Sequence, residues 1–292
     1  MARGTAIVTG ASSGIGAAIA RRLHDDGFTV YAAARRLDRM AGLAQAGVHA
    51  MAIDVTDDEA LRRLVDLAAG ETGRIDVLVN NAGYGSFGAV EDVPLAQARQ
   101  QFEVNVFAVA RLCQLVLPHM RAARSGRIIN ISSIGAKIYQ PCGAWYHASK
   151  FAVEGLSDCL RLECAPLGIQ VVVVQPGGVV SEFSAAAGES LVRASGSGAY
   201  ADQARRVASY LTIDAATVAE KAGPVASAPS VVAAAVARAV RARRPRTRYR
   251  VGRGAKAIAV ARWLLSDRAF DRLIDRTIDF LNWFAVRALG HR

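Results

Sequence analysis

Three residues have the types and the spacing for proton transfer: Ser133, Tyr146 and Lys150. Tyr146 and Lys150 stand four positions apart, so on a helix they share one face. An ammonium held beside a phenol favours the phenolate and lowers the pKa of the tyrosine from its ordinary value of about 10. A serine hydroxyl delivered from a strand end can hold the substrate oxygen. These residues predict one proton-transfer site, although a Tyr-x-x-x-Lys pair alone also suits a solvated helix face.

The elements that must position these side chains alternate along the chain. Short apolar runs suit buried parallel strands, and longer amphipathic stretches suit the helices between them. Strands are predicted at 6–8, 30–32, 51–53, 77–79, 128–131, 171–174 and 247–251. Helices are predicted at 17–26, 59–70, 95–121, 145–165 and 231–241. This alternation predicts an α/β fold with a doubly wound parallel sheet of about seven strands.

Two regions interrupt the alternation. Residues 182–229 are rich in Ala, Ser and Gly and follow the sixth predicted strand. Ligands of open α/β sheets bind beyond the carboxyl ends of the strands, so we expect a lid or substrate loop here. A surface insertion without substrate contact is the alternative. Residues 255–292 are expected to form a basic, amphipathic helical extension, which leaves residues 1–254 as the main domain.

The formal net charge of +11 is unevenly distributed along the 292 residues. Residues 238–292 contain 15 Lys or Arg and 4 Asp, whereas residues 1–237 contain 21 basic and 21 acidic side chains. The basic excess therefore belongs to the C-terminal end and does not indicate a nucleic-acid-binding domain. A hydrophobic content of 52% is sufficient for a large core.

Cysteine usage and the first residues give expectations about location. The four cysteines show no metal-binding spacing and are expected to be reduced thiols in the core, so the sequence predicts no metal site. No charged and then apolar leader precedes the first predicted strand, and we expect a cytoplasmic protein.

A glycine-rich segment joins the first predicted strand to the first helix. Its residues permit a tight turn and a close approach of the backbone to a pyrophosphate. The N-terminus of the following helix offers N–H groups and a positive dipole to the same anion. This position in the first βα unit predicts a dinucleotide site that includes Gly10, Ser12, Ser13, Gly14, Ile15 and Gly16.

The end of the second predicted strand indicates which dinucleotide is bound. Ala34 stands where an acidic residue would hold the ribose hydroxyls of NAD, and Arg35 and Arg36 follow. Arg35 can neutralise a 2′-phosphate, with a serine of the glycine-rich segment donating a hydroxyl, so we predict NADP(H); Arg36 is expected to be solvated. After the third strand, Asp54 and Val55 are expected to contact the adenine, with Asp54 as a cap of the following helix as the alternative.

With these residues in place, the chain resembles the short-chain dehydrogenase/reductase family, in its single-domain form, over residues 5–252. The resemblance rests on Thr9-Gly10-x-x-x-Gly14-x-Gly16, Asn80-Asn81-Ala82-Gly83, Asn105, Ser133, Tyr146-x-x-x-Lys150 and Pro176-Gly177. Each motif recurs by chance, but their joint occurrence in this order is specific. The resemblance implies a Rossmann-type sheet and an oxidoreductase whose NADP(H) cofactor carries the hydride.

The resemblance also implies a role for each matched residue. Tyr146 would be the general acid in carbonyl reduction, or the base in alcohol oxidation, and Lys150 would lower its pKa and hold the nicotinamide ribose. Ser133 would bind the substrate oxygen, and Asn105 would hold a water that links Lys150 to a proton wire. Residues at other strand ends would line the cofactor: Asn81, Ala82, Gly83, Pro176, Gly177, Val179 and Ser181.

Aromatic residues dominate the segments that overhang the expected nicotinamide site, which favours an apolar substrate. The candidates are Tyr84, Phe87, Tyr139, Cys142, Trp145, Phe183, Leu191, Tyr200 and Tyr210. We expect an NADP(H)-dependent enzyme that transfers hydride between nicotinamide and an apolar ketone, aldehyde or secondary alcohol. Two alternatives stay open: a 3-oxoacyl thioester reductase that uses a carrier protein, and a non-catalytic NADPH-binding sensor.

The C-terminal extension leaves its own alternatives open. Segments 248–252 and 267–271 are similar to the branch that includes hydroxysteroid and retinol dehydrogenases. Phe270, Ile274 and Ile278 recur at helical spacing, so the helix can pack over the substrate pocket or a dimer interface. Its basic excess also suits peripheral contact with an anionic membrane surface. We further expect the enzyme to be a homo-oligomer.

Overall fold

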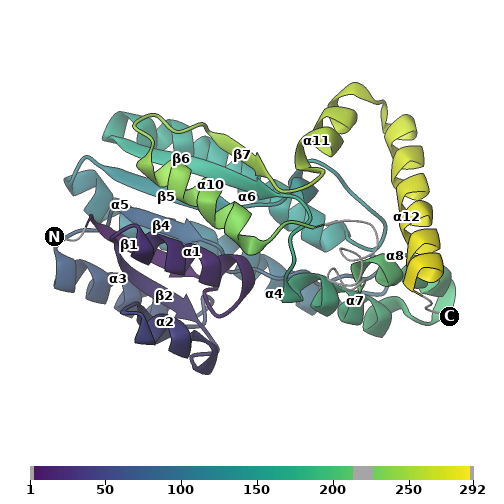
Figure 1. Cartoon of the computed structure of the whole chain (residues 1–292), viewed down its shortest axis with the longest axis horizontal. Helices are drawn as coiled ribbons and strands as arrows, with labels where there is room; N and C mark the ends of the chain where they lie inside the picture. The colour runs from purple at the N-terminus through teal and green to yellow at the C-terminus, as the bar shows by residue number, and fades with distance from the viewer. Residues whose placement is uncertain (1–2, 213–225, 290–292) are drawn as a thin grey trace.

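One parallel sheet of seven strands forms the centre of the protein (Figure 1). The computed structural model describes residues 3–212 and 226–289. The strands are β1 (Thr5–Thr9), β2 (Thr29–Ala34), β3 (His49–Ala52), β4 (Val77–Asn80), β5 (Gly126–Ile131), β6 (Ile169–Pro176) and β7 (Arg248–Val251). Their order is β3-β2-β1-β4-β5-β6-β7, and neighbouring strands pair in parallel. The predicted doubly wound, Rossmann-type sheet is confirmed.

Helices cover both faces of the sheet. The helices of this layer are α1 (Gly14–Asp25), α2 (Ala41–Gln45), α3 (Asp58–Thr72), α4 (Leu95–Phe102), α5 (Ala108–Ala122), α6 (Ala144–Cys164) and α10 (Pro229–Arg241). Successive strand residues point to opposite sides. Ala6 and Val8 of β1 therefore pack in the cluster of α1 and α10, whereas Ile7 packs in the cluster of α3, α5 and α6. All three side chains are fully buried.

The helix predicted at 95–121 is interrupted in its middle. α4 ends at Phe102, a π-helical turn spans Glu103–Phe107, and α5 begins at Ala108. A π turn inserts one residue into the helical ladder and changes the direction in which the side chains after it point. The interruption places Asn105 in the wide turn, with 1% of its surface exposed.

The segment predicted as a loop after β6 is largely helical where the structure describes it. α7 spans Glu182–Ser195 and α8 spans Ala201–Leu211, while residues 213–225 lie outside the described residues. The prediction of a loop at 182–229 is wrong for these two helices. Alanine has the highest intrinsic helix propensity, and the segment is richer in Ala than in Gly.

Two further helices follow the last strand and stand beside the sheet (Figure 1). α11 spans Ala255–Leu264 and α12 spans Asp267–Leu289. α12 runs back along α8, and its Ile274 and Ile278 pack into the apolar cluster that also contains Tyr146. No helix in the described part of the chain is long and apolar enough to cross a membrane.

Candidate active site

Tyr146 lies in the first turn of α6, opposite the segment that leaves β5. Its side chain is 8% exposed and shares a hydrogen bond with Ser133, which follows the end of β5. Ser133 is itself held in place, because its hydroxyl accepts the N–H of Gly135 at 3.0 Å. Burial raises the pKa of Tyr146 to about 12, and the hydrogen bond with Ser133 acts in the opposite direction. The phenol is therefore protonated at neutral pH.

Lys150 lies one helical turn after Tyr146 and is also buried, with 7% of its surface exposed. Its Nζ donates to the carbonyl oxygen of Ile131, the last residue of β5, at 3.1 Å. Burial lowers the pKa of Lys150 to about 8, and the charge of Glu154 partly opposes this effect. The structure thus places an amine that can exchange protons close to neutrality beside the strand that leads to Ser133.

Asn105 and Lys150 converge on the segment after β4. A Cβ added to Gly83 would lie 3.0 Å from the Asn105 Oδ1 and 3.6 Å from the Lys150 Nζ. Asn105 is fixed by Tyr84, because its Oδ1 accepts the Tyr84 N–H at 3.1 Å and its Nδ2 donates to the Tyr84 carbonyl at 2.9 Å. Its Nδ2 also donates to the Ser149 hydroxyl at 3.0 Å, which ties the π turn to α6. The four predicted catalytic residues are therefore gathered around the carboxyl ends of β4 and β5.

The glycine-rich segment packs closely against the end of β4. Gly10 has a φ of +67°, and a Cβ there would lie 2.8 Å from the Ala82 Cα. Gly16 lets α1 approach the turn, because a Cβ there would lie 2.1 Å from the Gly10 carbonyl oxygen. Asn81 joins the two strand ends by donating its side-chain N–H to the Thr9 carbonyl at 2.9 Å. Only glycine fits both positions.

The N-terminus of α1 suits a pyrophosphate group. Ser13 stands at the N-cap position, and its side chain makes no capping hydrogen bond there. The first N–H groups of the helix are therefore left for an anion, together with the positive end of the helix dipole. Gly14, which begins the helix, lies across from Ser181, with 3.5 Å between an added Cβ and the Ser181 Cβ. These features fit the diphosphate of a dinucleotide.

Arg35 and Arg36 point in different directions from the end of β2. The charge of Arg35 acts on the Tyr84 phenol, whose pKa is raised by burial and lowered by that charge. The Arg36 Nη2 lies 3.4 Å from the Ser12 hydroxyl and 3.5 Å from the Ser13 hydroxyl. Arg36 also pairs with Glu182, so the expectation that it is merely solvated is wrong. The groups that suit a 2′-phosphate thus include Arg36 as well as Arg35.

The remaining predicted cofactor residues lie at the same edge of the sheet. Pro176 ends β6, and the Gly177 N–H donates to the Val251 carbonyl at 2.8 Å. Val179 bridges to Ser227 beyond the strand. At the end of β3, Asp54 accepts the N–H and the hydroxyl of Thr56, whereas the cap of α3 is Asp57. Asp54 is therefore not the helix cap, and Val55 is buried beside it.

An apolar wall encloses the Tyr146 ring. The rings of Phe87 and Phe183 lie 5.5 and 5.1 Å from it, and a buried cluster continues outward into α7, α8 and α12. Five of the nine predicted pocket residues belong to this cluster: Phe87, Cys142, Phe183, Leu191 and Tyr210. The wall consists mainly of hydrocarbon, which suits an apolar substrate.

The other predicted pocket residues face elsewhere. Trp145 lines a groove with Phe102 and Phe107 on the α4 side, because consecutive residues of a helix point in different directions. The Tyr139 hydroxyl donates to Asp271 of α12 at 2.9 Å, and the Tyr200 hydroxyl donates to Glu91 at 2.8 Å. Tyr84 borders the site through its backbone bonds with Asn105.

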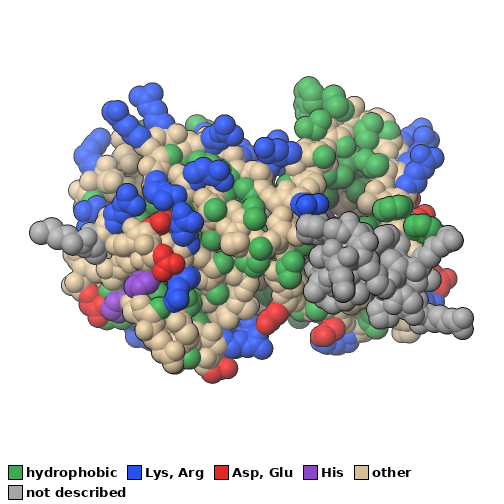
Figure 2. Space-filling model, in the orientation of Figure 1, with side chains coloured by type: hydrophobic (Ala, Val, Ile, Leu, Met, Phe, Trp, Pro, Cys, Tyr) green, Lys and Arg blue, Asp and Glu red, His purple; other side chains and the backbone are tan. Residues whose placement is uncertain are grey.

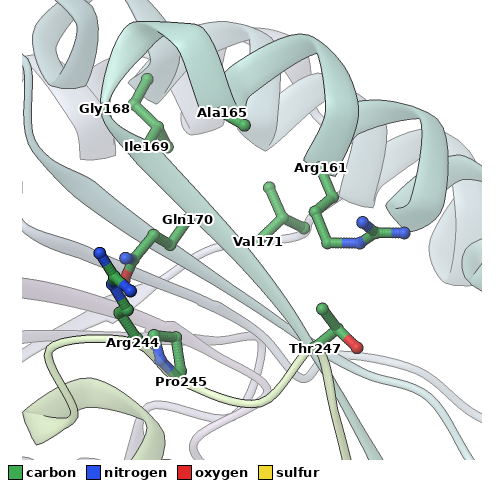
Figure 3. Close-up of a pocket in the computed structure, with 9 residues that line it drawn as sticks. All are labelled: Arg161, Ala165, Gly168, Ile169, Gln170, Val171, Arg244, Pro245 and Thr247. Atoms are coloured by element: carbon green, nitrogen blue, oxygen red, sulfur yellow. The ribbon is translucent and has the colours of Figure 1, made fainter.

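A separate hollow lies at the opposite end of the sheet (Figure 3). It has a volume of about 280 Å³ and is lined at the amino ends of β6 and β7 by residues that include Ile169, Arg244 and Thr247. Its Arg161 is already paired with Asp158 at 3.0 Å. This hollow contains none of the predicted catalytic residues, and parallel sheets bind ligands at the other edge.

Two contributors to the site were missed by sequence reasoning. Ser149 accepts from Asn105 and donates to the Tyr146 carbonyl at 2.7 Å, so it joins the π turn to the catalytic helix. Its position three residues after Tyr146, on the same helix face, was the available signal. His147 is buried, with its Nδ1 2.7 Å from the Gly135 carbonyl oxygen, and it supports the turn that holds Ser133.

Comparison with known proteins identifies the family. The family model for short chain dehydrogenase matches residues 4–191. The chain belongs to the short-chain dehydrogenase family. A short-chain dehydrogenase structure from Streptomyces avermitilis superimposes on this short-chain dehydrogenase with a TM-score of 0.75 and 30% identity, and each chain is covered over 100% of its length.

Two curated relatives of this short-chain dehydrogenase are named as reductases. The 3-ketodihydrosphingosine reductase of Bacteroides thetaiotaomicron is 43% identical over 178 residues, which cover 61% of this chain and 65% of that protein. The NADPH-dependent 3-dehydrocapnine reductase of Ornithobacterium rhinotracheale is 32% identical over 278 residues, which cover 92% of this chain and 95% of that protein. The chain is therefore an oxidoreductase of this family.

Proposed function

We propose that this short-chain dehydrogenase uses NADP(H) to interconvert an apolar ketone or aldehyde and the matching alcohol. The observation that carries the proposal is the position of Tyr146. Its hydroxyl bonds to Ser133 at the ligand-binding edge of the sheet, and its ring is enclosed by Phe87 and Phe183. A proton donor beside a second hydroxyl, inside an apolar wall, suits a carbonyl group carried by an apolar molecule.

The proposed chemistry divides the work between cofactor and protein. NADP(H), when bound, supplies or accepts the hydride. In the reducing direction the Ser133 hydroxyl donates a hydrogen bond to the carbonyl oxygen, and the Tyr146 hydroxyl transfers its proton to that oxygen as negative charge develops there. The carbonyl becomes the alcohol, and the tyrosine is left as a phenolate. Lys150 stabilises this phenolate by its charge, and Asn105 holds the water through which the proton is returned.

The two perturbed pKa values suit an enzyme that begins its cycle with a protonated tyrosine. A pKa of about 12 keeps Tyr146 protonated at neutral pH, so it starts the cycle as an acid. A pKa of about 8 places Lys150 within reach of proton exchange with solvent. The two relatives are also named as reductases, of 3-ketodihydrosphingosine and of 3-dehydrocapnine. We therefore propose a ketone with an apolar chain as the substrate class.

The preference for NADP(H) is supported by charge at the end of β2. Ala34 offers no carboxylate to the ribose, Arg36 places a guanidinium group near Ser12 and Ser13, and Arg35 adds a second positive charge at the same strand end. Arg36→Ala and Arg35→Ala should each raise the KM for NADPH roughly tenfold or more, because a charge-assisted contact is lost, and should change the KM for NADH little.

The matched control for these variants is Arg21→Ala. Arg21 is an exposed arginine on α1 that pairs with Asp25 and lies away from the glycine-rich turn. It should leave both KM values unchanged. Equal changes for NADPH and NADH in Arg35→Ala and Arg36→Ala would remove the assignment of a 2′-phosphate site.

A substrate screen separates the proposed function from its alternatives. Purified protein is assayed with free long-chain ketones and with a 3-oxoacyl group on a carrier protein, each with NADPH and with NADH. Turnover of the free ketone with NADPH supports the proposal, whereas turnover of the carrier-bound substrate alone supports a thioester reductase. NADPH binding without any turnover supports a sensor.

We also propose that the enzyme contacts an anionic membrane through α11. Val260, Trp263 and Leu264 form one exposed apolar face of this helix, with exposed fractions of 49%, 83% and 66%. Figure 2 shows this apolar patch over α11. Lys256 lies on the same exposed side and Arg253 precedes the helix, so the face combines apolar and basic groups as interfacial helices do. On α12, Ile274 and Ile278 pack towards the Tyr146 cluster, in line with the alternative that this helix packs over the substrate pocket.

A homo-oligomer remains part of the proposal. The groove beside Trp145 has an apolar rim in which Leu95 and Phe107 are 58% and 55% exposed. An exposed apolar groove of this kind suits a second copy of the chain. Light scattering during size-exclusion chromatography should give a mass above that of one chain, and Phe107→Asp should lower it.

A further inference from the structure

Glu182 makes an ion-pair network with the arginines that follow β2. Its carboxylate lies 3.3 Å from the Arg36 Nη2 and 2.5 Å from the Arg39 Nη1. Glu182 is the first residue of α7, and it is separated in sequence from Arg36 by 146 positions. The contact therefore joins the cofactor side of the sheet directly to the helix that covers the substrate pocket.

The Glu182 carboxylate lies beside the arginines, where an external anion could otherwise bind. The same Arg36 nitrogen lies 3.4 and 3.5 Å from the hydroxyls of Ser12 and Ser13, the groups that the proposed function assigns to the 2′-phosphate. The pKa of Glu182 is lowered, first by its hydrogen bond with Arg39 and further by Arg36, so the group is negative at neutral pH. A dianionic phosphate beside these guanidinium groups would be repelled by the carboxylate, because both groups are negative.

The residue that follows Glu182 links this competition to the substrate pocket. Phe183 directly follows Glu182 and contacts the Tyr146 ring at 5.1 Å between ring centroids. It also covers Gly85, where an added Cβ would lie 2.6 Å from the Phe183 Cζ. A movement of the first turn of α7 that takes Glu182 away from the arginines also moves Phe183, because the two residues are adjacent in one helix.

We propose that Glu182 is an internal competitor of the cofactor 2′-phosphate, and that binding of NADP(H) displaces it and shifts the first turn of α7. The inference rests on the proposed NADP(H) site and adds a determinant of affinity to it. The ion pairs of Glu182 with Arg36 and Arg39 contribute a modest free energy, because the three side chains are 43 to 58% exposed and exposed ion pairs are weak. Removal of the carboxylate charge should therefore tighten binding of the phosphorylated ligand by roughly two- to tenfold.

The test uses adenosine 2′,5′-bisphosphate and adenosine 5′-monophosphate as probes, measured by titration calorimetry. Glu182→Gln should bind the bisphosphate more tightly than the wild type does and should bind the monophosphate equally well. Glu189→Gln is the matched control, because Glu189 is an exposed carboxylate about two turns further along α7. It should change neither affinity. Thermal unfolding of each variant establishes that the fold is intact.

The outcomes separate this inference from the proposed function. If the wild type binds the bisphosphate no more tightly than the monophosphate, the NADP(H) site itself is wrong. If the wild type prefers the bisphosphate but Glu182→Gln leaves its affinity unchanged, only the competition is wrong. Weaker binding of the monophosphate or of NADH to Glu182→Gln would show that the carboxylate holds the ribose hydroxyls, which also overturns the inference.

Hydrogen exchange tests the coupling to α7. Adding adenosine 2′,5′-bisphosphate to the wild type should raise amide exchange at 182–186, because the carboxylate loses its partners. Glu182→Gln should show raised exchange there already without the ligand. Unchanged exchange at these amides in both proteins would overturn the proposed shift of the helix.

Discussion

The catalytic end of the sheet and the C-terminal cap are built by different physical means. The catalytic end, around Asn105, Tyr146 and Lys150, consists of buried polar groups that are fixed by hydrogen bonds to neighbouring segments. The cap consists of α7, α8, α11 and α12, whose buried sides are mainly apolar and whose polar contacts include exposed ion pairs such as Arg206 with Asp279. Buried hydrogen bonds fix individual atoms, whereas apolar packing encloses a volume. The first region therefore suits the proposed proton transfer, and the second supplies much of the apolar wall around the Tyr146 ring.

The family model covers six of the seven strands and most of α7. The family model ends at residue 191, before α8, α11 and α12. The relative with 43% identity matches over 61% of this chain, and the relative that matches 92% of it is 32% identical.

Two tyrosines give the largest expected contrast between the regions. Tyr146→Phe removes the proposed proton donor and should lower kcat by about 10²- to 10⁴-fold, with NADPH binding retained. Tyr139→Phe removes a hydroxyl that bonds to Asp271 of the cap and should change kcat less than about tenfold. Steady-state turnover and cofactor fluorescence check both variants. Comparable losses of kcat in the two variants would contradict the proposed difference between the two regions.

Lys150 should make the wild type more stable as the pH rises above neutrality. Its folded pKa of about 8 lies below its ordinary value of 10.5, so at pH 7 folding buries a charged amine at a cost. Between pH 8 and 10.5 the unfolded chain binds the proton and the folded chain does not, so stability rises with pH. Relative to Lys150→Met, the wild type should gain on the order of 2 kcal/mol between pH 7 and 9.5.

Urea unfolding at the two pH values measures this difference. The variant should also lose turnover, because it lacks the charge that stabilises the phenolate. A pH dependence that runs parallel in the wild type and in Lys150→Met would show that the amine is not buried as a charged group at pH 7.

The sequence predicted the catalytic end better than the cap for a physical reason. The central strands β1, β4, β5 and β6 are largely buried apolar runs, so composition locates them, whereas the partly exposed β7 was predicted from its place after the helix at 231–241. The π turn at Asn105 was not predicted, because its sequence has the periodicity of an ordinary helix. The helices α7 and α8 were predicted as a loop from the Ala, Ser and Gly content of residues 182–229, although Ala204, Val207 and Ala208 of α8 recur at helical spacing on its buried face.

Side-chain direction also lay outside what the sequence could predict. Arg35 and Arg36 are adjacent and identical, and only the structure shows that Arg36 reaches Ser12 and Ser13. Likewise, the sequence of an amphipathic helix such as α12 shows that one face is apolar, but not which element packs against that face. The structure turns Ile274 and Ile278 towards the Tyr146 cluster and leaves the apolar face of α11 exposed.

Glycines provide a smaller contrast between the regions. A Cβ at Gly16 would meet the Gly10 carbonyl oxygen at 2.1 Å, and this backbone atom is fixed between β1 and α1. A Cβ at Gly188 of α7 would meet the Thr212 Cγ2 at 2.6 Å, and this side-chain methyl can move. Gly16→Ala should therefore lower the free energy of unfolding by about 1–3 kcal/mol or more, and Gly188→Ala by less.

Gly70→Ala supplies the baseline for this series. No atom lies within 4 Å of a Cβ at Gly70, which is in α3, so alanine should stabilise the helix by up to about 1 kcal/mol. Denaturant unfolding of the three variants measures their free energies of unfolding and so ranks the three substitutions. A cost at Gly188 equal to that at Gly16 would mean that the cap is as rigid as the cofactor turn.

The last prediction concerns the proposed membrane contact of the cap. Trp263 and Leu264 at the end of α11 project apolar surface beside basic residues. The double variant Trp263→Ser, Leu264→Ser should bind vesicles of phosphatidylcholine and phosphatidylserine at least several-fold more weakly, because burial of each apolar side chain contributes up to about 1.5–3 kcal/mol. Vesicle sedimentation measures the bound fraction, and added salt should weaken the wild type as the basic groups are screened.

Leu162→Ser is the control for this variant, since Leu162 is 67% exposed on α6 and Leu264 is 66% exposed on α11. Loss of the Leu162 side chain from α6 should leave vesicle binding unchanged if α11 is the element that contacts the membrane. If both variants bind as the wild type does, the cap does not contact the membrane. If the double variant instead lowers the mass measured by light scattering, the α11 face belongs to a second copy of the chain. A specific loss at α11 would extend the contrast between the regions, because the cap would then present the enzyme to the phase in which an apolar ketone concentrates.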